Sequence, residues 1–288
     1  MSDVVVRGVS HYYQWICQDA SASSEHPKPV MVFLHGWGGS SAYWQTTATA
    51  LAPDFDCLLY DLRGFGQSQS APKDQDNPQA YNLPSYVTDL KEFLDGLGLE
   101  KVYLNAHSTG ASIAALFLSQ YPDRVYQAIL TCSGIFTYEP LPFALFHLMG
   151  GYVVQFRPRW LSQIPGVARL FMSRFLDRPI PQAWQQEFLE DFLQANATAA
   201  LGLMYSAVSE WAAIQIPQAF ARIQTPTLLI SGEFDQIIPA PLGQTAAQLN
   251  PRVKQIVIPK TGHFPMLEDA ATYLAVVNNF LKVPQPHP

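Results

Sequence analysis

Apolar runs with the length of buried strands alternate with helix-like segments along most of this chain. Runs of this kind lie at residues 30–34, 57–60, 102–106 and 128–132. Strands covered on both faces of a sheet read as such near-continuous apolar runs. Helical patterns separate them, at residues 42–51, at residues 83–97 and after residue 108, and two further strands are predicted at residues 4–9 and 12–17. This alternation predicts an α/β fold with a doubly wound, mostly parallel sheet.

The alternation stops after Gly134. Residues 136–217 contain no clear strand but several prolines and many aromatic residues, and strands resume at residues 227–230 and 255–258 before a closing helix at 271–281. We therefore predict a core domain made of residues 1–135 and 218–288. Residues 136–217 are predicted to form a helical cap, inserted after the sixth strand and lying over the carboxyl ends of the strands, where such sheets bind ligands. Residues 21–29 are predicted to form a polar loop and residues 283–288 an irregular tail.

Composition narrows the classes of function. The 288 residues are 48% hydrophobic and 14% charged, which predicts a well-packed globular protein. The net charge of −6, without a basic stripe, argues against a nucleic-acid partner. Neither a secretory signal nor an apolar run of membrane-spanning length is visible, so a cytoplasmic location is expected. Cys17, Cys57 and Cys132 each lie in a predicted strand and are expected to be buried thiols.

A serine lies on a tight turn between the strand at 102–106 and the helix that follows it. The turn reads Ala106-His107-Ser108-Thr109-Gly110, close to the G-x-S-x-G pattern of a strained strand-to-helix elbow that exposes the serine hydroxyl. Small residues must flank the serine because strand and helix nearly touch there. Gly110 meets this need, and Ala106 replaces the usual first glycine. Ser108 is thus a candidate nucleophile, which requires an adjacent base.

The candidate base is His263, in the loop after the last predicted strand. A base of this kind needs an acid that orients it, and Asp235 follows the preceding strand, with Glu233 as the nearest rival. The order Ser108, Asp235, His263 is the one expected for such a triad on an α/β sheet.

Two backbone amides are candidates for stabilising an oxyanion. The segment His35-Gly36-Trp37-Gly38-Gly39 follows the strand at 30–34, and its glycines allow close approach of the backbone to a substrate. The N–H groups of Trp37 and of Thr109, the residue after the serine, are the predicted pair. His35 is expected to shape this loop by hydrogen bonding. The Trp37 side chain is expected either to line the pocket mouth or to have a packing role within the protein.

A further loop signature lies at residues 61–68, Asp61-Leu62-Arg63-Gly64-Phe65-Gly66-Gln67-Ser68. It lacks the glycine-rich turn and lysine of a nucleotide loop. An ion pair or a structural brace is the interpretation that the pattern favours.

Together these segments resemble the α/β-hydrolase superfamily, in the group that has a serine nucleophile and a helical cap. The resemblance covers about residues 4–135 and 218–281. It implies catalytic roles for Ser108, Asp235 and His263 and backbone oxyanion contacts from Trp37 and Thr109, with no cofactor and no metal. Ala106 and Ala111 stand where many relatives have glycine. Serine in place of aspartate at position 108 disfavours the dehalogenase and epoxide hydrolase branches.

The expected function is that of a serine hydrolase. It would cleave a carboxylic ester, or less readily a thioester or amide, of a hydrophobic small molecule through an acyl-serine intermediate. The same fold and triad also serve carbon–carbon bond hydrolysis, lyase or cofactor-free peroxidase chemistry, or a low-turnover ligand receptor. The sequence leaves the substrate, the acyl chain length and the oligomeric state open.

The predicted cap is rich in aromatic and arginine residues. Between Glu139 and Asp177 it contains no acidic residue. One interpretation is a lid whose apolar face packs on the site while its arginines meet solvent, and its apolar character favours a hydrophobic substrate. The other is peripheral contact of the cap with an anionic membrane.

Overall fold

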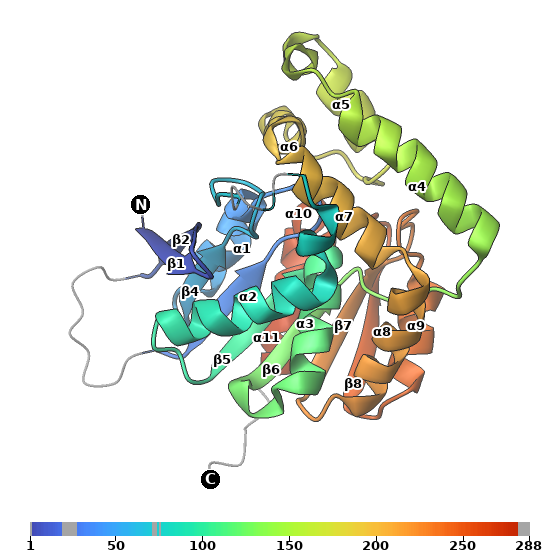
Figure 1. The fold of residues 1–288 in the computed structure, drawn as a ribbon. Coiled ribbons are helices and arrows are strands. Elements are labelled where there is room, and N and C mark those ends of the chain that lie inside the picture. The colour runs from blue at the N-terminus through green and yellow to red at the C-terminus, as the bar shows by residue number, and fades with distance from the viewer. Residues whose placement is uncertain (1, 19–27, 71–73, 75, 282–288) are drawn as a thin grey trace.

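The computed structural model describes residues 2–18, 28–70, 74 and 76–281. The predicted loop at 21–29 lies almost entirely outside these residues, and the predicted tail at 283–288 lies wholly outside them. Eight strands form one sheet, in the order β1-β2-β4-β3-β5-β6-β7-β8 (Figure 1). They are β1 (Ser2–Val6), β2 (Val9–Ile16), β3 (Val30–Leu34), β4 (Asp56–Tyr60), β5 (Val102–His107), β6 (Val125–Thr131), β7 (Thr227–Gly232) and β8 (Val253–Ile258).

The sheet is mostly parallel. β1 pairs antiparallel with β2, and β2 pairs antiparallel with β4. Every neighbouring pair from β4 to β8 is parallel. The sheet and its flanking helices confirm the predicted fold class.

The turn of the first hairpin lies earlier in the chain than predicted. β1 ends at Val6 and β2 begins at Val9, so the turn is Arg7-Gly8, whose φ values are 51° and 80°. A two-residue hairpin turn requires such positive φ angles to match the twist of its strands. The strand predicted at 4–9 therefore ends three residues earlier than expected.

Alternate side chains of the central strands enter two separate cores. On β3, Val32 and Leu34 belong to the core that includes side chains from α2 (Leu83–Gly96), α3 (Thr109–Gln120) and α8 (Glu210–Arg222). Met31 and Phe33 belong to the opposite core, with side chains from α1 (Gln45–Leu51) and α11 (Ala270–Leu281). The two-residue period of a strand sends neighbours to opposite faces, so the continuous apolar run of β3 reflects burial on both sides. Helix α9 (Ala240–Gln248), between β7 and β8, was not predicted.

Only helices lie between β6 and β7 in the described residues, as the loss of strand patterning predicts. They are α4 (Pro140–Gln155), η5 (Arg159–Gln163), α5 (Val167–Met172), α6 (Gln182–Gln194), α7 (Ala197–Ala207) and α8 (Glu210–Arg222). In Figure 1, α4 to α7 lie above the sheet, at one end of its strands. Helix α8 lies beside the sheet and contacts α3. The predicted boundary between residues 217 and 218 falls inside α8.

Two of the three cysteines are buried, as predicted. Cys57 and Cys132 are buried, but Cys17 is exposed. The expectation of a buried thiol was wrong for Cys17 because β2 ends at Ile16, and the chain leaves the sheet at that point. No helix of the described residues is long and apolar enough to cross a membrane.

Candidate active site

Ser108 is the single residue between β5, which ends at His107, and α3, which begins at Thr109. Its φ of 54° and ψ of −121° place it in a region that non-glycine residues rarely adopt. The Ser108 N–H donates to the Thr131 carbonyl at 2.8 Å, which holds this strained backbone against β6. A Cβ at Gly110 would collide with the His35 carbonyl oxygen, so glycine is needed there.

The three candidate catalytic side chains form one hydrogen-bonded chain. Asp235 Oδ2 lies 2.8 Å from His263 Nδ1, and His263 Nε2 lies 2.9 Å from Ser108 Oγ. All three residues are buried. Because a carboxylate can only accept, Nδ1 carries the imidazole proton and Nε2 is left to accept the Ser108 hydroxyl proton. The structure thus brings together the three residues that the sequence places about 30 to 150 positions apart.

Asp235 is held in its charged form. Burial alone would raise the pKa of its carboxyl, but the His263 charge, the His263 hydrogen bond and the Ile237 and Ile238 amides lower that pKa below its usual value. These two amides donate to Asp235 Oδ1 at 2.8 and 3.0 Å. The rival carboxylate, Glu233, is exposed and accepts the Lys260 N–H at 2.9 Å. Asp235 is therefore the acid that reaches His263.

The two candidate oxyanion amides flank Ser108. Gly36 approaches so closely that a Cβ placed on it would lie 3.1 Å from Ser108 Cβ, which puts the loop carrying Trp37 beside the serine. Thr109 opens α3, where the first N–H groups of a helix have no partner within the helix. Among the hydrogen bonds of the described residues, neither the Trp37 nor the Thr109 backbone N–H is a donor. Both amides are therefore available to an anionic oxygen.

His35 and the Trp37 side chain shape this loop. His35 Nε2 accepts the Leu62 N–H at 2.9 Å, so its other nitrogen carries the proton and donates to the Gly36 carbonyl at 2.8 Å. Burial lowers the pKa of His35, which favours this neutral form. The Trp37 indole N–H donates to the Ala200 carbonyl of α7 at 2.8 Å, a packing role across to the predicted cap.

A third histidine, His107, supports the site, and the sequence did not predict this role. Its Nε2 donates to the His263 carbonyl at 2.7 Å, and its Nδ1 accepts the Tyr43 hydroxyl at 2.9 Å. The Tyr43 oxygen in turn accepts the Gly36 N–H at 2.6 Å. These hydrogen bonds form a relay through His107. The relay links residues 35–39, which we call the oxyanion loop, to the backbone of His263. Tyr43 lies in η1 (Ser41–Trp44) and carries no motif that marks it.

Glu268 is the other unpredicted residue. It ends the short helix α10 (Pro265–Glu268), and its buried carboxylate accepts four backbone N–H groups at 2.7 to 3.1 Å. The donors are Gly262, Phe264, Asp177 and Arg178. The first two flank His263, and the last two belong to the segment between α5 and α6. One carboxylate therefore binds that segment to the loop of the candidate base.

A backbone hydrogen bond also joins the segment between α5 and α6 to the loop that carries His263. The His263 N–H donates to the Phe175 carbonyl at 2.6 Å. A Cβ at Gly262 would lie 2.5 Å from the same carbonyl oxygen, so only glycine allows the two segments to meet. The backbone of His263 is thus held on both sides, by Phe175 and by His107.

One group of side chains near Ser108 has the composition of a metal site. Ligand atoms of His107, Cys132 and His263 lie within 4.8 Å of one another. All four imidazole nitrogens already have the hydrogen-bond partners described above, and burial raises the pKa of the Cys132 thiol well above its usual value. This donor set does not fit a metal ion, which needs free nitrogens and a thiolate.

The segment at residues 61–68 serves as a brace. Asp61 accepts the Ser41 N–H at 2.7 Å and the Gln67 N–H at 2.8 Å. Arg63 pairs with Asp89 of α2, with 2.8 Å between Nε and Oδ2. These bonds hold the loop after β4 against η1 and α2.

Two cavities lie near the site. The α3–α8 cavity, of about 30 Å³, is lined by Ser112, Gly134, Phe136, Phe143, Ala207, Ser209, Ala212, Ala213, Ile216 and Ile238. The Ser112 N–H donates to the Ser108 carbonyl, and the Ile238 N–H donates to Asp235, so this cavity lies beside the candidate triad.

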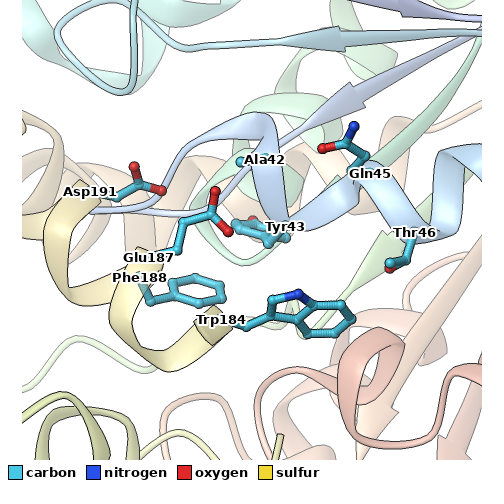
Figure 2. A pocket seen from close by; sticks show the side chains of 8 residues that line it. All are labelled: Ala42, Tyr43, Gln45, Thr46, Trp184, Glu187, Phe188 and Asp191. Atoms are coloured by element: carbon cyan, nitrogen blue, oxygen red, sulfur yellow. The ribbon is translucent and has the colours of Figure 1, made fainter. Parts of the chain in front are cut away.

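The α6 cavity is larger, about 180 Å³, and more polar. Figure 2 shows its lining: Ala42, Tyr43, Gln45, Thr46, Trp184, Glu187, Phe188 and Asp191. The Tyr43 ring stacks on Phe188 at 5.0 Å between centroids, and its hydroxyl points to His107. Tyr43 therefore stands between this cavity and the candidate triad.

Comparison with known proteins shows the family of this chain. The family model described as alpha/beta hydrolase fold matches residues 29–270. An uncharacterized protein of Mycobacterium tuberculosis is 26% identical over 270 residues, covering 90% of this chain and 76% of that protein. A proline iminopeptidase of Heyndrickxia coagulans is 27% identical over 281 residues, covering 88% and 90%.

Solved structures agree with the fold. An esterase from Exiguobacterium antarcticum superposes with a TM-score of 0.80 and 18% identity, covering 98% of this chain and 99% of that one. The likeness at this identity shows the fold, and the match of the family model over most of the chain shows the family. The chain belongs to the α/β-hydrolase family of enzymes.

Proposed function

We propose that this protein is a serine hydrolase that cleaves a carboxylic ester of a hydrophobic small molecule through an acyl-serine intermediate. The observation that carries the proposal is the hydrogen-bonded chain from Asp235 through His263 to Ser108, with the unpaired amides of Trp37 and Thr109 beside the serine. A nucleophile, a base, an orienting acid and two oxyanion donors are the parts that acyl transfer requires.

In this mechanism, Ser108 Oγ attacks the ester carbonyl carbon while His263 Nε2 takes the hydroxyl proton. Negative charge develops on the former carbonyl oxygen, and the N–H groups of Trp37 and Thr109 stabilise it. Asp235 stabilises the imidazolium through Nδ1. His263 then protonates the departing alcohol oxygen, which leaves an ester between the acyl group and Ser108. A water molecule, deprotonated by His263, then attacks the acyl carbon of that ester. His263 returns this proton to Ser108 Oγ as the bond to the serine breaks and the carboxylic acid is released.

Apolar surroundings support a hydrophobic substrate. The α3–α8 cavity beside Ser108 is lined mostly by apolar side chains, among them Phe136, Ile216 and Ile238. We propose that it receives the acyl group. A cavity of about 30 Å³ has room for roughly one water-sized group, so it suits a short acyl chain.

Turnover of p-nitrophenyl esters of increasing acyl length tests the proposal. We expect activity that favours short chains and that falls by about 10⁴-fold or more in Ser108→Ala. Equal activity of Ser108→Ala and the wild type would refute the serine mechanism. Saturable binding of esters without multiple turnover would point to the receptor alternative.

A further inference from the structure

The outer face of α4 is apolar and open to solvent. The helix contains no charged residue. Large apolar side chains along it and just after it are 52% to 83% exposed, namely Leu141, Leu145, Leu148, Met149, Tyr152 and Phe156. Their spacing of three or four residues places most of them on one side of the helix. An apolar surface of this kind marks an interaction site in a globular protein.

Contacts on the inner face of α4 fix this orientation. Gly150 faces α7 so closely that a Cβ would collide with Met204 Sδ. The His147 side chain bonds to the Val208 carbonyl, with 2.5 Å between Nε2 and the oxygen. The opposite side of the helix therefore faces outward, and in Figure 1 α4 runs along the outer side of the molecule.

The segment that continues from this apolar face carries only positive charge. The segment from residue 140 to residue 176 holds four arginines and no acidic residue, a charge of +4 in a chain whose net charge is −6. Arg157 turns inward, with its guanidinium 5.0 Å from the Phe192 ring. The other three, Arg159, Arg169 and Arg174, are exposed, and none of them takes part in the ion pairs of the described residues.

We infer that these apolar side chains, with Trp160, Leu170 and the three exposed arginines, form a docking surface for an anionic lipid bilayer. We call it the α4–α5 face. Leucine and phenylalanine side chains would enter the boundary between headgroups and acyl chains, while the guanidinium groups would contact lipid phosphates. Trp160 is 57% exposed and lies next to Arg159, and its amphipathic indole suits the depth of the headgroups.

Charge favours a bilayer over a second copy of this chain. A two-fold contact through the α4–α5 face would bring identical surfaces together. The three exposed arginines would then meet the same arginines of the other copy, and residues 140–176 supply no carboxylate to neutralise them. An anionic bilayer supplies both the apolar layer and the negative charge.

Co-sedimentation with vesicles of phosphatidylcholine mixed with phosphatidylglycerol tests the inference. We expect binding at low salt that weakens by about tenfold or more at high salt and on pure phosphatidylcholine. The double variant Phe156→Asp/Leu170→Asp should lose binding. Val5→Asp is the matched control, because Val5 is 71% exposed, like Phe156 at 72%, but lies on β1, outside the α4–α5 face.

The contribution of charge is measured separately. Changing Arg159, Arg169 and Arg174 together to glutamine should weaken binding to the mixed vesicles by about a hundredfold, at roughly fivefold for each arginine. Ser108→Ala should bind as the wild type does, so the result is independent of the proposed hydrolase activity. Unchanged melting temperatures would show that the variants are folded.

Three results would overturn the inference. The first is no binding to the mixed vesicles at low salt. The second is equal binding by the arginine variant and the wild type. The third is a concentration-dependent dimer that Phe156→Asp abolishes, which would assign the α4–α5 face to a second copy.

Discussion

The Glu268 carboxylate accepts the Asp177 backbone N–H at 2.7 Å, and so joins the segment between α5 and α6 to the loop that carries His263. The same carboxylate accepts the amides of Gly262 and Phe264 on either side of that histidine. The position of the proposed base therefore depends on a contact with the segment between α5 and α6. Any movement of that segment is expected to change the alignment of His263 with Ser108.

Glu268→Gln should lower both stability and turnover. The amide group of glutamine offers one acceptor oxygen in place of two, so its NH₂ would face backbone N–H groups that also donate. We expect a loss of about 1–3 kcal/mol in the free energy of unfolding, and a fall in kcat larger than the rise in KM. Urea denaturation and steady-state kinetics measure these quantities.

Glu233→Gln is the control for that variant, because Glu233 accepts a backbone N–H at the exposed surface of a neighbouring loop. It should leave stability within about 0.5 kcal/mol of the wild type. If Glu268→Gln matched this control in both measurements, the carboxylate would have no positioning role.

Tyr43→Phe should reduce kcat by about tenfold through misplacement of the oxyanion loop. The Gly36 N–H loses its acceptor, and His107 Nδ1 loses its donor, within a buried site. The free energy of unfolding should fall by about 1–3 kcal/mol. Tyr126→Phe, at a side chain that is 41% exposed on β6, should change neither quantity. Wild-type kinetics in Tyr43→Phe would show that the relay through His107 is dispensable.

Enlarging the α3–α8 cavity should change the acyl preference. In Phe136→Ala, removal of the ring makes room for longer chains, so the ratio of kcat/KM for octanoyl over acetyl esters should rise by about tenfold or more. Trp184→Ala enlarges the α6 cavity instead and should leave the ratio as it is. If Trp184→Ala shifted the preference and Phe136→Ala did not, the acyl group would bind on the other side of Tyr43.

Asp191 should make stability depend on pH. Burial, as the main cause, raises the pKa of its carboxyl to about 7. Between about pH 4 and pH 7 the Asp191 carboxyl therefore keeps its proton in the folded protein. In the unfolded chain, where the pKa of this carboxyl is near 4, it has lost that proton. Unfolding releases this proton, so the contribution of Asp191 to stability falls as the pH rises from about 4 to about 7.

Asp191→Asn removes this contribution. Urea denaturation at a series of pH values should show that the variant gains stability relative to the wild type as the pH rises through that range. A constant difference between the two proteins at every pH would contradict the raised pKa of Asp191.

Sequence patterns predicted most of the fold because the strands are encoded locally. The apolar run of β3 predicts burial on both faces, and the structure confirms the doubly wound sheet that follows from such runs. The boundaries were less predictable. The Arg7-Gly8 turn ended β1 earlier than the apolar pattern suggested, and α8 continues past the residue at which the predicted cap ends.

Some residues of the candidate site could be predicted from the sequence, and others could not. Ser108, Asp235 and His263 follow separate strands in a recognisable order, and the structure places them in one hydrogen-bonded chain. Tyr43 and Glu268 carry no such signal. Tyr43 contacts His107, 64 residues away, and Glu268 contacts Asp177, 91 residues away, and no local pattern encodes contacts at such separations.

Covalent labelling by a fluorophosphonate, measured as the mass of the intact protein and of its peptides, shows directly whether Ser108 is a nucleophile that His263 activates. The probe reacts with a serine that a neighbouring base activates, and its phosphonyl oxygen occupies the position of the oxyanion. We predict one label per chain, located on Ser108, absent in Ser108→Ala and much slower to form in His263→Ala. An unchanged mass at forcing probe concentrations, or a label that persists in Ser108→Ala, would rule out Ser108 as the nucleophile.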